Sequence, residues 1–243
     1  MKLRLACFLT IVVSLFCFNT TQAQQMPLYN QTLNAKEKSI IAISALTAKG
    51  DLTNLKTTLA SGLEAGLTVN EIKEVLVHLY AYCGFPRSIR GLQTFMQVLD
   101  ERKVKGIDDK IGKNASNIDE TGDKYDRGKK ILEELTRTPQ SDTLIGYSAF
   151  APAIDSFLKE HLFADIFERD ILSYAQRELV TISVLAAIGG AEPILKSHLA
   201  ICLNVGMTPR QLKQYAKIIK STIGKNEATA AQKVLDEVLK SKK

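Results

Sequence analysis

One helical pattern occurs twice in this chain, and that repeat limits the possible folds more than any other feature. Residues 33–50 align with residues 172–189 at an offset of 139, and residues 55–84 align with residues 195–224 at an offset of 140. A unit that leaves one apolar face uncovered can be stabilised by packing against its own copy. The repeat therefore predicts two similar units that pack about a pseudo-twofold axis and form one globular body.

Apolar residues recur with a helical period in both units, and alternating, strand-like runs are nearly absent. Gly66 and Gly206 follow apolar runs, where glycine commonly ends a helix. Thr68 and Thr208 are the expected N-caps of a third helix in each unit, and Glu71 would complete a capping box with Thr68. We predict an all-α protein whose first two helices per unit span 35–49 and 52–65, and 174–188 and 192–205.

The predicted order of segments is a signal peptide at 1–23, a first unit at 24–103, a linker at 104–147 and a second unit at 148–243. The first part of the linker is rich in Gly, Asp, Lys and Asn, and a short charged helix is expected at 126–136. A further helix over 148–165 is expected to lie against the second unit through a stripe formed by Phe150, Ile154, Phe157, Leu158 and Leu162.

The N-terminus has the three parts of a secretory signal peptide. Lys2 and Arg4 precede an apolar run at 5–18, which is too short to span a bilayer, and small residues follow it up to Ala23. Cys17 offers a lipoprotein anchor as the rival interpretation, but cleavage after Ala23 suits the sequence better. We therefore expect a protein exported to the periplasm, without a membrane segment once the signal is removed.

Charge and cysteine content narrow the function further. Removing the signal removes two positive charges and no acidic residue, so the formal net charge falls from +6 to +4. The basic residues are spread out and form no aromatic-studded cluster, which argues against binding of nucleic acid. Cys83 and Cys202 are the cysteines of the mature chain, too few for a disulfide scaffold.

The stretch EIKEVLVHLYAYCGFP, residues 71–86, combines most of the reactive residue types of the first unit. Glu71, Glu74, His78 and Tyr82 are spaced so that they share one face of a helix, which could support proton transfer. The structural alternative is a histidine at the edge of the core and glutamates in solvent.

These residues carry a resemblance to a known family. Residues 71–86 resemble the end of a carboxymuconolactone decarboxylase unit, a family that also includes the alkyl hydroperoxidase D-type proteins. In the second unit, residues 151–152, 161–166 and 176–182 resemble the lead-in and first helix of the family. Residues 197–199 and 204–208 resemble its histidine helix. The resemblance covers most of the mature chain and implies an all-α enzyme that forms homo-oligomers.

The sequence departs from the peroxidase members of that family. Those members carry C-x-x-C-x-x-x-H, whereas Ala191 and Ile194 stand before His198 here. Dithiol chemistry needs a low-pKa thiolate and a resolving partner. Cys83 and Cys202 occupy unrelated places in the repeat, so a thiol pair is not expected.

Each unit keeps the polar family residues that the other unit has lost. The first unit has Lys38, Ser39 and Thr58 in place of the family's arginine, glutamate and histidine, and the second has Gln214, Ile218 and Ile223 in place of a glutamate, a histidine and a cysteine. We therefore predict one composite pocket between the units, lined by Glu74, His78, Tyr82, Cys83, Glu178 and His198.

Such a pocket could decarboxylate a small organic acid or lactone without a cofactor. His78 or His198 would act as general acid, since histidine exchanges protons near neutrality, and Glu74 or Glu178 would hold the imidazole in one tautomer. Arg177 could bind the substrate carboxylate as a bidentate partner, or it could form a structural ion pair. A metal site from Glu74, His78 and His198 is a weaker interpretation.

Two other interpretations stay open at this point. Peroxiredoxin-like reduction of alkyl hydroperoxides would depend on Cys83, and a non-catalytic binding protein would keep the fold without chemistry. The partner expected for the enzyme is a small-molecule substrate.

Overall fold

A computed structural model describes residues 31–119 and 121–241, and the regular secondary structure of this part of the chain is all helical, without strands. The predicted signal peptide at 1–23 lies outside the described residues. No helix within the described residues is long and apolar enough to cross a bilayer. The all-α prediction is confirmed.

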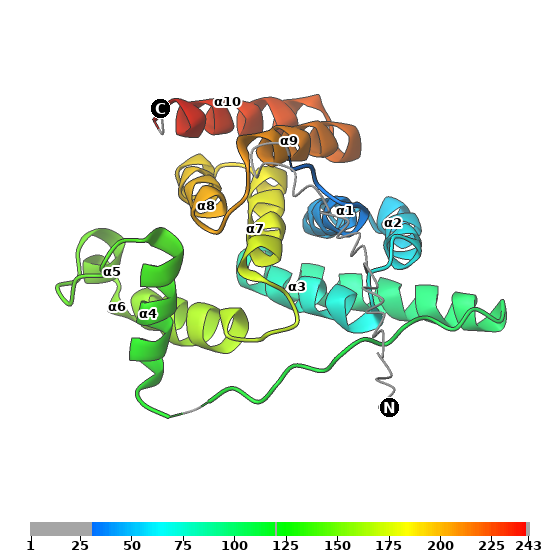
Figure 1. Cartoon of the computed structure of the whole chain (residues 1–243), viewed down its shortest axis with the longest axis horizontal. Coiled ribbons are helices and arrows are strands. Elements are labelled where there is room, and N and C mark those ends of the chain that lie inside the picture. Colours follow the sequence, from blue (N-terminus) through cyan, green and yellow to red (C-terminus); the bar gives the residue numbers. More distant parts are fainter. Residues whose placement is uncertain (1–30, 120, 242–243) are drawn as a thin grey trace, which may run out of the picture.

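Helix bounds agree closely with the sequence prediction in both units (Figure 1). The first unit consists of α1 (Ala35–Lys49), α2 (Leu52–Glu64) and α3 (Val69–Val104), and the second of α7 (Tyr174–Ile188), α8 (Glu192–Asn204), α9 (Pro209–Ile223) and α10 (Lys225–Ser241). Gly84 breaks α3 with φ 78° and ψ 161°, so its two halves correspond to α9 and α10. Thr68 and Thr208 cap their helices as predicted, each through a capping box.

The packing of the two units is reciprocal. Helix α1 packs against α7, its counterpart in the repeat, while α1 also contacts α9 and α7 contacts α3. Such exchange of equivalent contacts is what a twofold arrangement produces. Leu55, Ile72 and Val75 of the first unit and Leu199, Leu212 and Ile219 of the second belong to one shared core. The α3–α7 contact, visible where α7 crosses the middle of the molecule in Figure 1, positions the candidate site.

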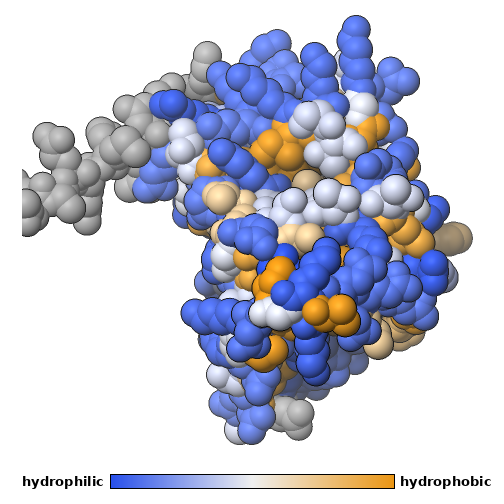
Figure 2. Space-filling view, turned by 90° about the vertical axis from the view of Figure 1, so that its right-hand side faces the viewer, coloured by the Kyte–Doolittle hydropathy of each residue, from blue (hydrophilic) through white to orange (hydrophobic). Residues whose placement is uncertain are grey.

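Between the units, an extended segment leads to a separate group of helices (Figure 1). This group contains α4 (Lys124–Thr136), α5 (Gly146–Phe150), α6 (Pro152–Ser156) and the π-helical segment η2 (Phe157–Phe167). It packs on α8 and reaches Tyr80 and Tyr82 of α3 through a second hydrophobic cluster, so this group of helices helps to enclose the site. The end of the molecule near α2 instead presents a mostly hydrophilic surface with small, separate hydrophobic areas (Figure 2).

The predicted continuous helix at 148–165 is wrong. Pro152 starts a new helix after Ala151, and the chain from Phe157 onward winds as a π-helix, which shifts the residues that face inward. Phe150 and Phe157 are 91% and 65% exposed, and Ile154 is also exposed. Leu162 of the predicted stripe is buried and Leu158 packs against the same cluster, and the other buried apolar residues of η2 are Phe163, Ala164, Ile166 and Phe167.

Helix α4 approaches η2 so closely that Gly128 has no room for a side chain. A Cβ atom at Gly128 would lie 1.8 Å from the backbone oxygen of Lys159. Gly128→Ala should therefore lower the free energy of unfolding by about 2–3 kcal/mol, because α4 would have to move away from η2. Urea denaturation checks this, with Lys130→Ala on the exposed side of α4 as the control. Equal stability of both variants would contradict the close approach.

Candidate functional site

Polar residues from both units meet where α3, α7 and α8 converge beside the end of η2. His78 comes from α3, Arg177 and Glu178 from α7, and His198 from α8. Arg177 and Glu178 are fully buried, as is His78, and 8% of His198 is exposed. The twofold-related positions carry Lys38, Ser39, Thr58 and Ile218, so the cluster occurs at one of the two equivalent places.

Glu74 is held by two arginines. Its carboxylate accepts hydrogen bonds from Nε and Nη2 of Arg169 at 2.9–3.0 Å and from Nη2 of Arg177 at 2.8 Å. Of the two glutamates predicted to hold an imidazole, Glu74 does not do so, because both of its oxygens are bound to guanidinium groups. The same contacts leave Glu74 unsuited to a metal site with His78 and His198.

Of the two roles predicted for Arg177, substrate binding and a structural ion pair, the structure shows the ion pair, which Arg177 forms with Glu74. Besides Glu74, its Nη2 donates to the backbone oxygen of Arg169 at 2.6 Å. Its guanidinium group also lies over the ring of Phe167, 5.9 Å from the centroid. Nε of Arg177 has no hydrogen-bond partner within residues 31–119 and 121–241, so one donor stays available.

Both ring nitrogens of His78 are engaged. Nδ1 lies 3.2 Å from Nη1 of Arg177, and Nε2 lies 3.0 Å from Oγ1 of Thr181. A guanidinium group can only donate, so Nδ1 accepts, and the proton assigned to Nε2 is donated to Thr181. Thr181 in turn donates to the backbone oxygen of Arg177. Burial first, then the positive charges of Arg177 and His198, hold the pKa of His78 well below its usual 6.5, so this imidazole is neutral.

A neutral buried His78 makes stability depend on pH. Below about pH 6.5 the unfolded chain protonates this histidine and the folded chain does not, so the free energy of unfolding should decrease by up to about 1.4 kcal/mol per pH unit. Urea denaturation at pH 7 and pH 5 should show a smaller loss for His78→Gln than for the wild type. His161→Gln, on an exposed position of η2, should retain the wild-type loss. An unchanged pH dependence in His78→Gln would contradict the assigned charge.

His198 forms the second acid–base unit of the site. Its Nδ1 lies 2.8 Å from Oε2 of Glu178, as the sequence analysis allowed. Nε2 of His198 makes no hydrogen bond within the described part of the chain, and 10% of the side chain is exposed, against none for Glu178. His198 is thus an imidazole oriented by a carboxylate, with its other nitrogen available to a reactant.

Tyr82 lies between the two histidines. Its ring stacks on His78 with centroids 5.5 Å apart and meets His198 edge-on at 6.1 Å. Burial, followed by the charge of Glu178, raises the pKa of Tyr82, which keeps the phenol protonated. Its hydroxyl and Oε1 of Glu178 are buried without hydrogen-bond partners among the described residues. Together with Nε of Arg177, they are the polar atoms that a bound molecule or water could satisfy.

The two cysteines do not form a redox centre. Both are free thiols; Cys83 is half-buried and donates to the backbone oxygen of Leu79, whereas Cys202 is buried in the core. Burial raises the pKa of Cys83 to about 11 against a smaller opposing effect of Arg87, and it raises the pKa of Cys202 as well. Thiols in this state are weak nucleophiles near neutrality.

Thr181, Arg169 and Phe167 were missed by the sequence analysis. Thr181 follows Arg177 by four residues on α7, so helical spacing could have placed it beside the cluster. Phe167 packs against His78 with ring centroids 5.2 Å apart. No local pattern marks Arg169 or Phe167, because the path of the chain after η2 brings them to α3.

The fold and site define a class: an all-α protein of two repeated units, with a buried acid–base cluster between them. The sequence pattern of the carboxymuconolactone decarboxylase family matches residues 19–95 and 152–237. The chain belongs to the carboxymuconolactone decarboxylase family. It is also similar to a 4-carboxymuconolactone decarboxylase of Acinetobacter baylyi, with 29% identity over 118 residues, which cover 48% of this chain and 87% of that protein.

Proposed function

We propose that this protein is an exported enzyme that decarboxylates a small organic acid or lactone by acid–base chemistry in a single composite site. The observation that carries the proposal is the His198–Glu178 pair, with Nδ1 of the imidazole 2.8 Å from the carboxylate and Nε2 free of hydrogen bonds within the described residues. Family membership and the similarity to a 4-carboxymuconolactone decarboxylase support the reaction class. Export rests on the signal-like sequence at 1–23.

The site residues divide into different roles in this proposal. In a decarboxylation, the bond between the substrate carbon and its carboxylate breaks, CO₂ leaves, and the electron pair is delocalised onto a conjugated oxygen. The Tyr82 hydroxyl and Nε–H of Arg177 are the unpartnered donors available to that oxygen. Nε2 of protonated His198 then delivers a proton to the carbon, while Glu178 holds the imidazole. His78, neutral and bonded on both sides, positions Tyr82 by stacking rather than donating a proton.

The test is an assay of the purified mature protein against a set of carboxylated lactones and small 3-oxo acids, following release of CO₂. Turnover that is lost in His198→Ala and retained in His161→Ala would support the proposal. Turnover that is unaffected by His198→Ala would contradict the assignment of His198 as the general acid. Absence of turnover with every substrate, combined with saturable binding of one of them, would favour a non-catalytic binding protein.

The peroxidase alternative is disfavoured by the state of Cys83. With a pKa of about 11 its thiol is almost fully protonated at pH 7, and Cys202 is buried elsewhere in the core. Cys83→Ser should therefore change the rate of decarboxylation of any active substrate by less than about twofold, because the thiol has no role in the proposed chemistry. Steady-state kinetics measure this effect. If the wild type reduced hydroperoxides and Cys83→Ser did not, the peroxidase function would be favoured over decarboxylation.

A further inference from the structure

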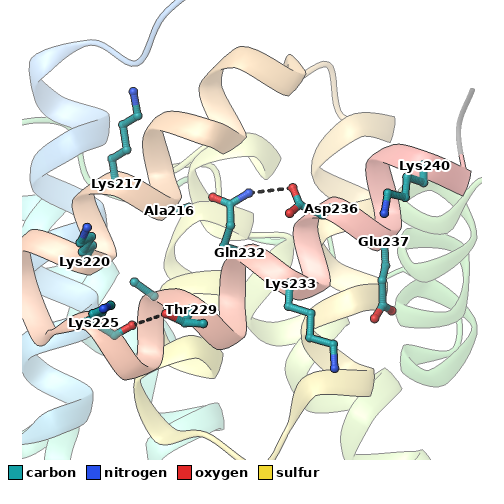
Figure 3. A pocket seen from close by; sticks show the side chains of 11 residues that line it. Ala216, Lys217, Lys220, Lys225, Thr229, Gln232, Lys233, Asp236, Glu237 and Lys240 are labelled. Carbon is teal, nitrogen blue, oxygen red and sulfur yellow. Dashed lines mark hydrogen bonds between the residues drawn. The ribbon is translucent and has the colours of Figure 1, made fainter.

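A groove between α9 and α10 lies apart from the site described above. It has a volume of about 620 Å³ and is bordered by Lys217 and Lys220 of α9 and by Lys225, Lys233 and Lys240 of α10. Figure 3 shows these lysines around the central residues Gln232 and Asp236. All five lysines are exposed, and the floor includes the small side chains of Ala216 and Ala228.

The positive charge of this groove is largely uncompensated. None of the five lysines forms an ion pair with any residue in the described ranges, 31–119 and 121–241. Of the two acidic residues that border it, Glu237 pairs with Lys196 of α8 at 3.1 Å, and Asp236 accepts a hydrogen bond from Gln232 at 2.8 Å. Like charges gathered without counter-ions repel one another, so an anion would stabilise the groove.

The other unit shows that the fold does not require these lysines. The buried residues Ala231, Leu235 and Val238 of α10 correspond to Gly91, Phe95 and Val98 of α3 at an offset of 140, and those are buried too. At the same offset, the lysine positions are occupied by Val77, Tyr80, Phe85, Gln93 and Asp100. Positive charge at this place is therefore specific to the second unit rather than a consequence of the helical repeat.

We propose that the α9–α10 groove binds a small organic anion carrying at least two phosphate groups. The groove has the size of a small-molecule site, and its concave shape suits a discrete ligand better than a flat bilayer surface. One phosphate monoester carries about 1.5 to 2 negative charges at neutral pH, so two phosphates roughly balance five ammonium groups less the carboxylate of Asp236, whose partner Gln232 is neutral. Lysine binds phosphate as a flexible point charge, and the lysines that line the groove come from both helices, although Lys217 and Lys233 extend in opposite directions (Figure 3).

Isothermal titration calorimetry of the full mature protein with inorganic tripolyphosphate tests the proposal. Saturable binding with a Kd below about 1 mM at low salt is expected, and it should weaken as salt rises because the charges are exposed. Lys220→Gln/Lys225→Gln should weaken binding at least about tenfold, since two charge-assisted contacts are removed. Lys103→Gln/Lys105→Gln, exposed on α3 and at its end, gives the same loss of charge away from the groove and should leave the Kd unchanged.

The same experiment can overturn the proposal. Equal weakening in both double variants would show that only net charge matters, and absence of binding at millimolar tripolyphosphate would remove the groove as an anion site. Binding to phosphatidylglycerol vesicles without binding to tripolyphosphate would indicate a membrane surface instead of a small ligand. Circular dichroism spectra that match the wild type would show that the variants are folded. The outcome is independent of the decarboxylase proposal, which concerns different residues.

Discussion

Replacing His198 with alanine is expected to lower kcat by about 10²–10⁴-fold while leaving KM within a few-fold, because a positioned general acid acts mainly in the transition state. The imidazole is the partly exposed member of the cluster, and its Nδ1 is already held 2.8 Å from Glu178. Steady-state kinetics with the substrate identified in the decarboxylation assay measure the loss.

Two further variants separate catalysis from folding. Glu178→Gln should reduce kcat and alter its pH profile, because the neutral amide no longer stabilises the imidazolium. His161→Ala removes a histidine that pairs with Asp165 on the exposed side of η2, and it should retain full activity. A kcat that falls equally in all three variants would point to a general loss of structure instead of a lost proton donor.

Glu74→Ala is expected to cost about 3–5 kcal/mol of stability, because the fully buried Arg177 would lose its carboxylate partner. Arg169 would also lose its contact with Glu74, although its side chain is 37% exposed and can be solvated. Urea or thermal unfolding measures the loss of free energy.

The matched control is a surface pair. Glu237→Ala removes an ion pair with Lys196 whose two side chains are about half exposed, and it should cost no more than about 1 kcal/mol. Replacing both buried partners, as in Glu74→Leu/Arg177→Met, should recover part of the stability because no isolated charge stays buried. A cost of Glu74→Ala no larger than that of Glu237→Ala would mean that water reaches Arg177.

Local sequence determined most of the helical framework. Glycine stops and apolar periods act within a few residues, so α1, α2, α7 and α8 could be placed almost to the residue. The repeat also predicted the composite site: His78 of one unit and His198 of the other both contact Tyr82. A twofold arrangement brings complementary halves together regardless of the details of packing, so the repeat could indicate which residues meet, while their role as a catalytic pocket stays a prediction.

The partners and charge states inside the site were decided by the tertiary structure. Arg169, 95 residues from Glu74 along the chain, takes the carboxylate that helical spacing had assigned to an imidazole. Burial beside Arg177 makes His78 neutral and leaves His198 as the available acid. The π-helical winding of η2 likewise exposes Phe157 and turns Phe167 toward His78. Burial and long-range ion pairing here depend on where the chain places Phe167 and Arg169, which precede the aligned repeat of the second unit, and helical spacing carries no information about that.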